Sequence, residues 1–228
     1  QGLRLVPEIE VTVMKRLLLD MDPGIDDALA LLMALGAERD KEVAIEGITA
    51  VAGNVESELA AENVCKILEL AGREYRIFRP GIGIQHGEVA QPGCLDVAVG
   101  AGTPLNRPLR TAKFVHGEDG LGNTGLPVSR VREAVFAIAR TALNTSPGID
   151  SSTRFDASGT GVSAAAALIH EKAGRWPGEI TLVATGPLTN VAQALTAFPK
   201  LAAELKEIVL MGGAAKVPGN ATPVAEYN

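Results

Sequence analysis

Cysteine is scarce in this sequence. The 228-residue chain has only Cys65 and Cys94, which are too few for a disulfide framework or for a metal site made of thiolates. Cys65 falls within an amphipathic stretch, where a small buried hydrophobic side chain is the simpler interpretation. Two cysteines are compatible with a reducing compartment.

Long apolar runs and basic clusters are also missing. No apolar run reaches the roughly 18 residues that a transmembrane helix requires. The first 13 residues, QGLRLVPEIEVTV, lack the basic-then-apolar layout of a signal peptide. The net charge is −6, with no Lys/Arg cluster to offset it, which argues against a nucleic-acid partner. We therefore expect a cytoplasmic protein with neither a membrane nor a nucleic-acid partner.

Apolar residues make up 46% of the chain, enough to bury one full core. Short β-type runs alternate with helical stretches, which is typical of a parallel sheet flanked by helices. We expect strands at 16–21, 43–51, 179–185 and 207–211, and helices at 26–36, 56–71, 168–173, 188–197 and 200–205. The predicted fold class is α/β, with a mostly parallel sheet.

Two stretches, residues 75–96 and 129–161, interrupt this alternation. The second contains NTSPGIDSSTRFDASGTG, whose low apolar content indicates a loop or disorder. No internal repeat and no linker between two domains is evident. We expect a single domain over residues 14–228, interrupted by these stretches and preceded by an extension over residues 1–13.

The segment LLLDMDPGIDDA, residues 17–28, places four carboxylates where a strand gives way to a helix. So much negative charge at one turn is unfavourable unless a cation or a hydroxyl-rich ligand lies within it. Oxygen-only ligands suit Ca²⁺ or Mg²⁺ rather than zinc. A plainer interpretation is a helix start, with Asp22 as N-cap, Pro23 at the first helical position, and Asp26 and Asp27 in the first turn. It leaves the gathering of Asp20 and Asp22 with the other acids unexplained.

Three further loops follow predicted strands, and in a parallel sheet such loops meet at one edge, where ligands bind. VAGN ends in Asn54, ATGPLTN contains Thr185, and GNATPVAEYN contains Asn220, Glu226 and Asn228. Each has a plain alternative: a turn asparagine, helix capping by Thr185 or Thr189, and a solvated loop. The lone histidine of the glycine-rich FVHGEDGLGN, His116, is more often structural than catalytic in such a setting.

Together, five segments resemble the inosine–uridine-preferring nucleoside hydrolase family: DMDPGIDDALALL, GITAVAGNV, FVHGEDGLGN, ITLVATGPLTNVAQAL and IVLMGGAAKVPGNATPVAEYN. They occur in the family's order. The resemblance implies a Rossmann-like fold and hydrolysis of the N-glycosidic bond of ribonucleosides to free base and ribose. It also implies a homo-oligomer, either a dimer or a tetramer.

The resemblance further implies one Ca²⁺ held by Asp22, Asp27 and the backbone carbonyl of Thr185, with Asp22 as general base toward a Ca²⁺-bound water. The implied sugar contacts are Asp26 and Asn228 at the 2′-hydroxyl, Asn220 and Glu226 at the 5′-hydroxyl, Asn54 in support, and Met211 lining the sugar pocket. The physics agrees, since a carboxylate-rich pocket stabilises an oxocarbenium-like transition state and hydrogen bonds to hydroxyls select ribose.

The sequence departs from the family pattern in several places. The family supplies a further Asp ligand from a C-terminal region beyond the last motif, whereas this sequence ends at Asn228. Residues 75–96 and 129–161 look like insertions, and the family-like part begins at Met14. One hypothesis is therefore a C-terminally truncated, inactive homologue that binds nucleoside, ribose or Ca²⁺. Another is a Mg²⁺-dependent phosphatase with Asp20 as nucleophile. Such phosphatases have a D-x-D motif after a hydrophobic strand, but their motif usually continues Gly-Thr.

Overall fold

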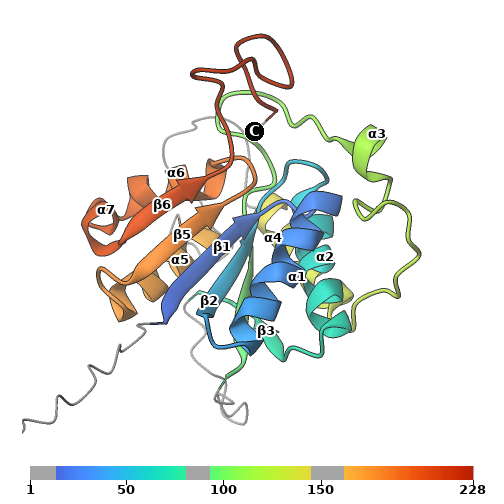
Figure 1. Ribbon diagram of the computed structural model, residues 1–228. Helices are drawn as coiled ribbons and strands as arrows, with labels where there is room; N and C mark the ends of the chain where they lie inside the picture. The colour runs from blue at the N-terminus through green and yellow to red at the C-terminus, as the bar shows by residue number, and fades with distance from the viewer. Residues whose placement is uncertain (1–13, 81–92, 145–161, 228) are drawn as a thin grey trace, which may run out of the picture.

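The computed structural model of the chain describes residues 14–80, 93–144 and 162–227. Its six strands are β1 (Lys15–Met21), β2 (Val43–Ala50), β3 (Tyr75–Ile77), β4 (Leu95–Val99), β5 (Ile180–Ala184) and β6 (Glu207–Leu210). They form one sheet in the order β3-β4-β2-β1-β5-β6, and every neighbouring pair is parallel. The predicted α/β class with a parallel sheet is confirmed (Figure 1).

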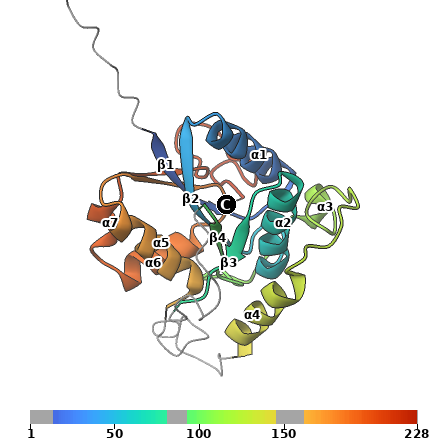
Figure 2. The same cartoon turned by 90° about the horizontal axis from the view of Figure 1, so that it is seen from below.

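The helices are α1 (Ile25–Arg39), α2 (Ser57–Leu70), α3 (Lys113–His116), α4 (Arg132–Asn144), α5 (Ala164–Arg175), α6 (Thr189–Ala197) and α7 (Leu201–Glu204). Figure 2 shows α1 and α2 on one side of the sheet and α5, α6 and α7 on the other. None of the helices in the described ranges is long and apolar enough to cross a membrane.

Two apolar layers hold the helices to the sheet. One joins β2 and β4 to α1 and α2, with Leu31, Ile48 and Val64 at its centre. The other joins β1 and β5 to α5 and α6, around Leu18 and Leu182. Because β1 is covered on both sides, its last four residues are all buried. This is why the strand has a continuous apolar run, interrupted only by Asp20.

The prediction that residues 75–96 interrupt the alternation is wrong at both ends of that stretch. Residues 75–77 form β3 and residues 95–99 form β4, and both strands belong to the sheet. Similarly, residues 132–144 of the second stretch form α4, which packs beside α2. The loop predicted at 144–161 and the N-terminal extension over 1–13 lie almost wholly outside the described residues, and whether the two stretches are insertions stays a prediction.

The first helix begins and ends differently from the prediction. Its N-cap is Gly24, with no side-chain cap, so Asp22 does not cap it. At the other end the helix passes the expected stop at Gly36. It closes with hydrogen bonds from Lys41 N to Glu38 O and from Glu42 N to Ala37 O, and Lys41 has a φ of 63°. This is a Schellman turn in which a lysine takes the place usually held by glycine.

Candidate functional site

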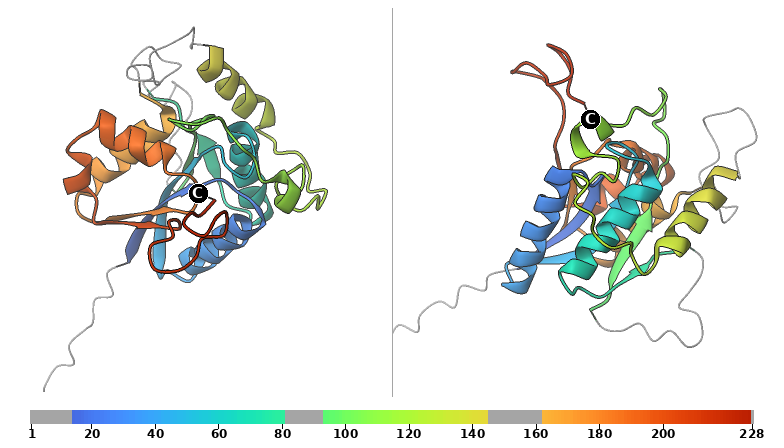
Figure 3. Two further views of the ribbon diagram at one scale, coloured as in Figure 1. Left: turned by 90° about the horizontal axis from the view of Figure 1, so that it is seen from above. Right: turned by 90° about the vertical axis from the view of Figure 1, so that its right-hand side faces the viewer.

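The predicted site loops do meet at one edge of the sheet. The strand register pairs Met21 with Ala50, Asp20 with Ala184, and Ala184 with Leu210. The four loops that follow β1, β2, β5 and β6 therefore leave the sheet side by side. Figure 1 and the right-hand view of Figure 3 show α3 and the C-terminal segment on this same side of the molecule.

Asp22 lies at the centre of this edge and is 2% exposed. Its Oδ2 accepts the backbone N–H of Asn54 at 2.8 Å, and its carbonyl oxygen accepts Nδ2 of Asn54 at 3.1 Å. Two glycines press against the carboxylate. A Cβ added to Gly53 would lie 2.0 Å from Oδ2, and one added to Gly186 would lie 2.6 Å from Oδ1. The glycines of VAGN and ATGP therefore let two loops close around one carboxylate.

Asp27 folds back from the first turn of α1 onto the end of β1. It is 5% exposed, and its Oδ2 accepts the backbone N–H of Asp22 at 3.0 Å. The side chain of Thr185 also hydrogen-bonds to it. By contrast, the side chain of Asp26 is 72% exposed, and its Oδ1 accepts the backbone N–H of Asp27. Asp22, Asp27 and Thr185 are thus together, and Asp26 lies at the solvent side of the group.

The environment of Asp22 and Asp27 disfavours the charged forms of both acids. Burial and the neighbouring charge of Asp27 raise the pKa of Asp22 to about 8. Burial likewise raises the pKa of Asp27 to about 6, even though the hydrogen bond from Thr185 opposes the shift. Desolvation penalises a carboxylate unless a positive charge compensates it. The pair is therefore arranged to gain from a cation, or from a proton taken up during a reaction.

Asp20 has a different environment, with no exposed surface at all. Its Oδ1 accepts hydrogen bonds from Thr49 Oγ1 at 2.5 Å and from Asn190 Nδ2 at 2.8 Å, while Oδ2 has no hydrogen-bond partner. Asn190 also donates to Ala50 O and accepts from Ala101 N. Asp20 thus ties β2 and α6 beneath the site. A nucleophile must be reached by its substrate, so this burial argues against the phosphatase alternative.

His116 lies closer to the site than the sequence suggested. Its Nδ1 accepts the backbone N–H of Ile25 at 3.1 Å, and a Cβ added to Gly24 would lie 2.6 Å from that nitrogen. The same added Cβ would lie 2.8 Å from Nδ2 of Asn54. His116 and Asn54 therefore flank one glycine of the turn that bears Asp22. In the sequence, this contact between His116 and the turn is indicated only by the glycines of DMDPG and FVHGEDG, which allow the two loops to approach closely.

The C-terminal segment, residues 211–227, forms a loop beyond β6 (Figure 3). Asn220 N donates to Oε1 of Glu226 at 3.2 Å, and Tyr227 N donates to Oδ1 of Asn220 at 2.9 Å. The Tyr227 hydroxyl donates to the carbonyl oxygen of Thr111 at 2.9 Å. Because Ala112 N donates in turn to Asn54 O, this loop is linked to the Asp22 site.

The sugar contact predicted for Met211 is not shown by the structure. Met211 extends β6 by donating its N–H to Ala184 O, and its side chain is 48% exposed. Asn228 lies outside the described residues. In the part of the chain that the structure describes, no group of three or more His, Cys, Asp or Glu side chains is arranged to hold a metal ion.

Comparison with known proteins identifies a family. The family model for inosine-uridine preferring nucleoside hydrolases matches residues 17–228. The probable uridine nucleosidase 2 of Arabidopsis thaliana is 36% identical over 218 residues, covering 94% of this chain and 52% of that protein. The inosine-uridine preferring nucleoside hydrolase of Leishmania major is 33% identical over 214 residues, covering 94% of this chain and 53% of that protein.

Solved structures show the same relationship. A plant nucleoside hydrolase, PpNRh1, superposes with a TM-score of 0.67 at 34% identity, covering 95% of this chain and 53% of that one. A purine-preferring ribonucleoside hydrolase from Gardnerella vaginalis gives a TM-score of 0.65 at 28% identity, over 94% of this chain and 54% of its own. The chain spans about half the length of the relatives it matches. By its sequence, its sheet and its loops, the chain belongs to the inosine-uridine preferring nucleoside hydrolase family.

Proposed function

We propose that the chain hydrolyses the N-glycosidic bond of ribonucleosides and releases free base and ribose. The observation that supports this most directly is the buried pair of Asp22 and Asp27 at the carboxyl edge of the sheet. Cleavage of a glycosidic bond passes through an oxocarbenium-like state, in which positive charge develops on the sugar ring. A buried, preorganised pair of carboxylates stabilises that charge far more than solvent does.

Asp22 is the proposed general base. A general base works best when its pKa lies near the pH at which the enzyme operates. Burial brings the pKa of Asp22 to about 8. The hydrogen bond from Asn54 N occupies Oδ2, which leaves Oδ1 to take a proton from water as that water attacks the anomeric carbon. The leaving base departs with the electrons of the glycosidic bond.

The cation we propose here is Ca²⁺. Carboxylate and carbonyl oxygens are the ligands that this hard cation prefers, and the residues that would hold it are Asp22, Asp27 and the backbone carbonyl of Thr185. Burial and neighbouring carboxylates, Asp27 beside Asp22 and Asp26 beside Asp27, raise the pKa of both acids, which fits such an occupant. When bound, Ca²⁺ supplies positive charge that lowers the pKa of an attacking water.

The remaining residues would bind the sugar. We assign Asp26 and Asn228 to the 2′-hydroxyl, Asn220 and Glu226 to the 5′-hydroxyl, Asn54 to support of the ring, and Met211 to the sugar pocket. Hydroxyl-specific hydrogen bonds discriminate strongly, because a missing hydroxyl leaves a polar group of the site unpaired.

The test is ribose release by the purified chain from inosine and from uridine, the two nucleosides that the family's name contains. We expect turnover in Ca²⁺ and its loss in EDTA, and Asp22→Asn should lower kcat by about 10²–10⁴-fold, as expected for loss of a general base. The alternative is an inactive homologue. Calorimetry with ribose, carried out in parallel, would identify it if ribose binds but no nucleoside is hydrolysed. The dimer or tetramer and the cytoplasmic location remain predictions; light scattering tests the former.

A further inference from the structure

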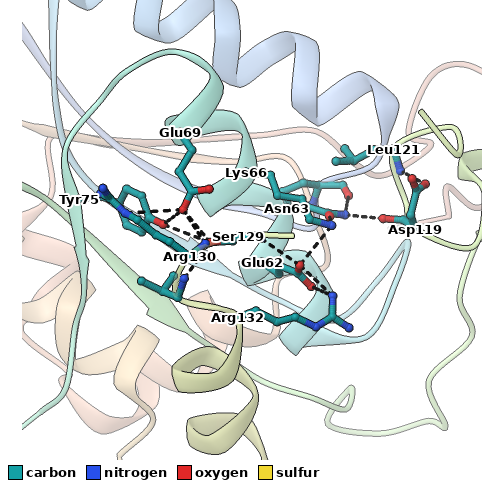
Figure 4. A network of polar contacts seen from close by, with 12 residues as sticks. Glu62, Asn63, Lys66, Glu69, Tyr75, Asp119, Leu121, Ser129, Arg130 and Arg132 are labelled. Carbon is teal, nitrogen blue, oxygen red and sulfur yellow. Dashed lines mark hydrogen bonds and ion pairs between the residues drawn. The ribbon is translucent and has the colours of Figure 1, made fainter. Parts of the chain in front are cut away.

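The polar face of α2 is buried beneath residues 117–132, which run from α3 to α4 (Figure 4). Glu62 has no exposed surface and pairs with Arg132. Two helical turns further along, Glu69 accepts a hydrogen bond from Ser129 Oγ at 2.8 Å. These contacts fasten the start of α4 to α2, at the end of the segment remote from the carboxylates.

Asn63 performs the equivalent task at the end near the site. It has no exposed surface, and its Nδ2 donates to the carbonyl oxygen of Asp119 at 2.8 Å and to that of Pro23 at 3.4 Å. Its Oδ1 accepts from Lys66 Nζ at 3.5 Å. One amide group therefore joins α2, the loop after α3, and the turn between Asp22 and α1.

The loop that Asn63 holds is closed by hydrogen bonds of its own. Asp119 Oδ1 accepts the backbone N–H groups of Leu121 and Asn123, each at 2.8 Å. Gly122 N donates to His116 O at 2.7 Å. Through these bonds, the position of the Asp119 carbonyl determines where His116 stands.

The same loop grips the turn at a second point. His116 Nδ1 accepts the backbone N–H of Ile25, which lies at the first position of α1 and has no partner within the helix. The turn that begins at Asp22 is thus held from Pro23 through Asn63 and from Ile25 through His116. Because α1 starts here, both contacts determine how Asp27 is presented to Asp22.

We propose that Asn63 is a positioning residue for the carboxylate site. It acts through Pro23 and the 116–123 loop, and it sets the placement of His116 and of the turn bearing Asp22. Its effect on turnover rests on the proposed function, whereas its effect on the geometry of the turn does not.

The close approach of the loop to Asn63 depends on Gly120. This residue has a φ of 74°, and a Cβ added to it would lie 2.8 Å from Asn63 Nδ2 and 3.2 Å from Pro23 O. Gly125 in the same segment has a nearly identical φ of 70°, but a Cβ added there meets nothing within 4 Å. A Cβ at Gly120 would also lie 2.9 Å from Val55 Cγ1. A comparison of alanine at Gly120 and at Gly125 therefore separates crowding beside Asn63 from backbone strain alone.

The experiment compares Asn63→Asp, which keeps the side chain's shape but removes its donors, with Ser129→Ala, which removes the hydrogen bonds of a hydroxyl group at the far end of the same segment. Amide exchange at Ile25 and the ¹⁵N signature of the His116 ring are measured without substrate. In the wild type we expect a protected Ile25 amide and an unprotonated Nδ1. Asn63→Asp should accelerate Ile25 exchange at least tenfold and alter the ring signature, whereas Ser129→Ala should change neither.

Gly120→Ala repeats the test from the loop side without altering α2, with Gly125→Ala as its matched control. We expect the first to reproduce the Ile25 and His116 changes of Asn63→Asp and to lower kcat about tenfold, and the second to leave them within twofold of wild type. If the Ile25 and His116 signals are the same in Gly120→Ala as in Gly125→Ala, the positioning role is wrong. Altered signals in a chain that never releases ribose would support the positioning and overturn the proposed function alone.

Discussion

The backbone N–H of Asp22 donates a hydrogen bond to the side chain of Asp27 at 3.0 Å. Through this bond the first turn of α1 reaches back to the end of β1, and two buried carboxylates become neighbours. The Nδ1 atom of His116 lies 4.0 Å from Oδ1 of Asp26, the exposed acid of this turn. Burial raises the pKa of both acids, Asp22 and Asp27, and the charge of Asp27 raises the pKa of Asp22 further. The consequences of these shifts can be measured.

Calcium should stabilise the folded chain. A ligand present at 100 times its Kd adds about 2.7 kcal/mol to the free energy of unfolding, which corresponds to a rise in Tm of roughly 5–10 °C for a chain of this size. Because Asp22 and Asp27 must be deprotonated to bind, the rise should grow between pH 6 and pH 8. Melting curves in Ca²⁺ and in EDTA check this. A shift of equal size in Asp27→Asn would place the cation elsewhere.

Gly53→Ala should disable the site without unfolding the chain. The new Cβ would fall 2.0 Å from Oδ2 of Asp22, so the carboxylate or the loop after β2 must move away. We expect nucleoside hydrolysis to fall by about 10²-fold, the scale of loss that follows a misplacement of about 1 Å.

Gly36→Ala is the matched control for that change. Gly36 lies within α1, and an added Cβ meets nothing within 4 Å. Alanine there should preserve activity and raise the free energy of unfolding by up to about 1 kcal/mol through helix propensity. Equal activities of the two variants would show that the carboxylate is not confined by Gly53.

The central part of the fold could be predicted because its sequence signals are local. Buried strands such as β1 and β5 are apolar runs, and α2 shows helical periodicity. The strands β3 and β4 were missed because β3 has only three residues and β4 contains Asp96. A charge in the middle of a strand normally argues against burial. Here it is tolerated because Lys172, 76 residues away, reaches it.

The candidate site could be predicted in outline for a related reason. Once a parallel sheet is expected, the loops after its strands must meet, so Asp22, Asn54 and Thr185 could be grouped in advance. The support beneath them could not be foreseen. Asn190 contacts Asp20 across 170 residues of sequence, and Asn63 reaches Asp119 across 56. Nothing local marks either asparagine as different from an ordinary helical residue.

The buried pair of Asp96 and Lys172 should govern part of the acid stability. Burial alone would raise the pKa of Asp96, but hydrogen bonds from Arg76 and Lys172 hold that pKa below its usual value. A lowered pKa means that this stabilisation is present above about pH 4 and is lost as the pH falls further. Asp96→Asn should cost about 3–5 kcal/mol at pH 7, since it leaves the buried Lys172 with only the exposed Glu171, 3.9 Å away.

Urea unfolding between pH 2 and pH 7 measures both parts of that prediction. The stability of Asp96→Asn should depend less steeply on pH below 4 than that of the wild type. Asp96→Asn combined with Lys172→Met should cost less than the sum of the single changes, because the double variant leaves no buried charge without its partner; Arg76, the other partner of Asp96, is partly exposed. Additive costs would mean that the two side chains do not interact.

Glu226 offers the sharpest test of sugar recognition. If its carboxylate accepts the 5′-hydroxyl, Glu226→Gln should lower kcat/KM for uridine by about 10–100-fold, the range for a hydrogen bond to a charged group. The same substitution should leave kcat/KM for 5′-deoxyuridine nearly unchanged, because that substrate lacks the hydroxyl. Thr222→Val, which removes a hydroxyl that accepts Val224 N in the same loop, controls for loop geometry. An equal loss with both substrates would mean that Glu226 serves only to shape the loop through its bond to Asn220.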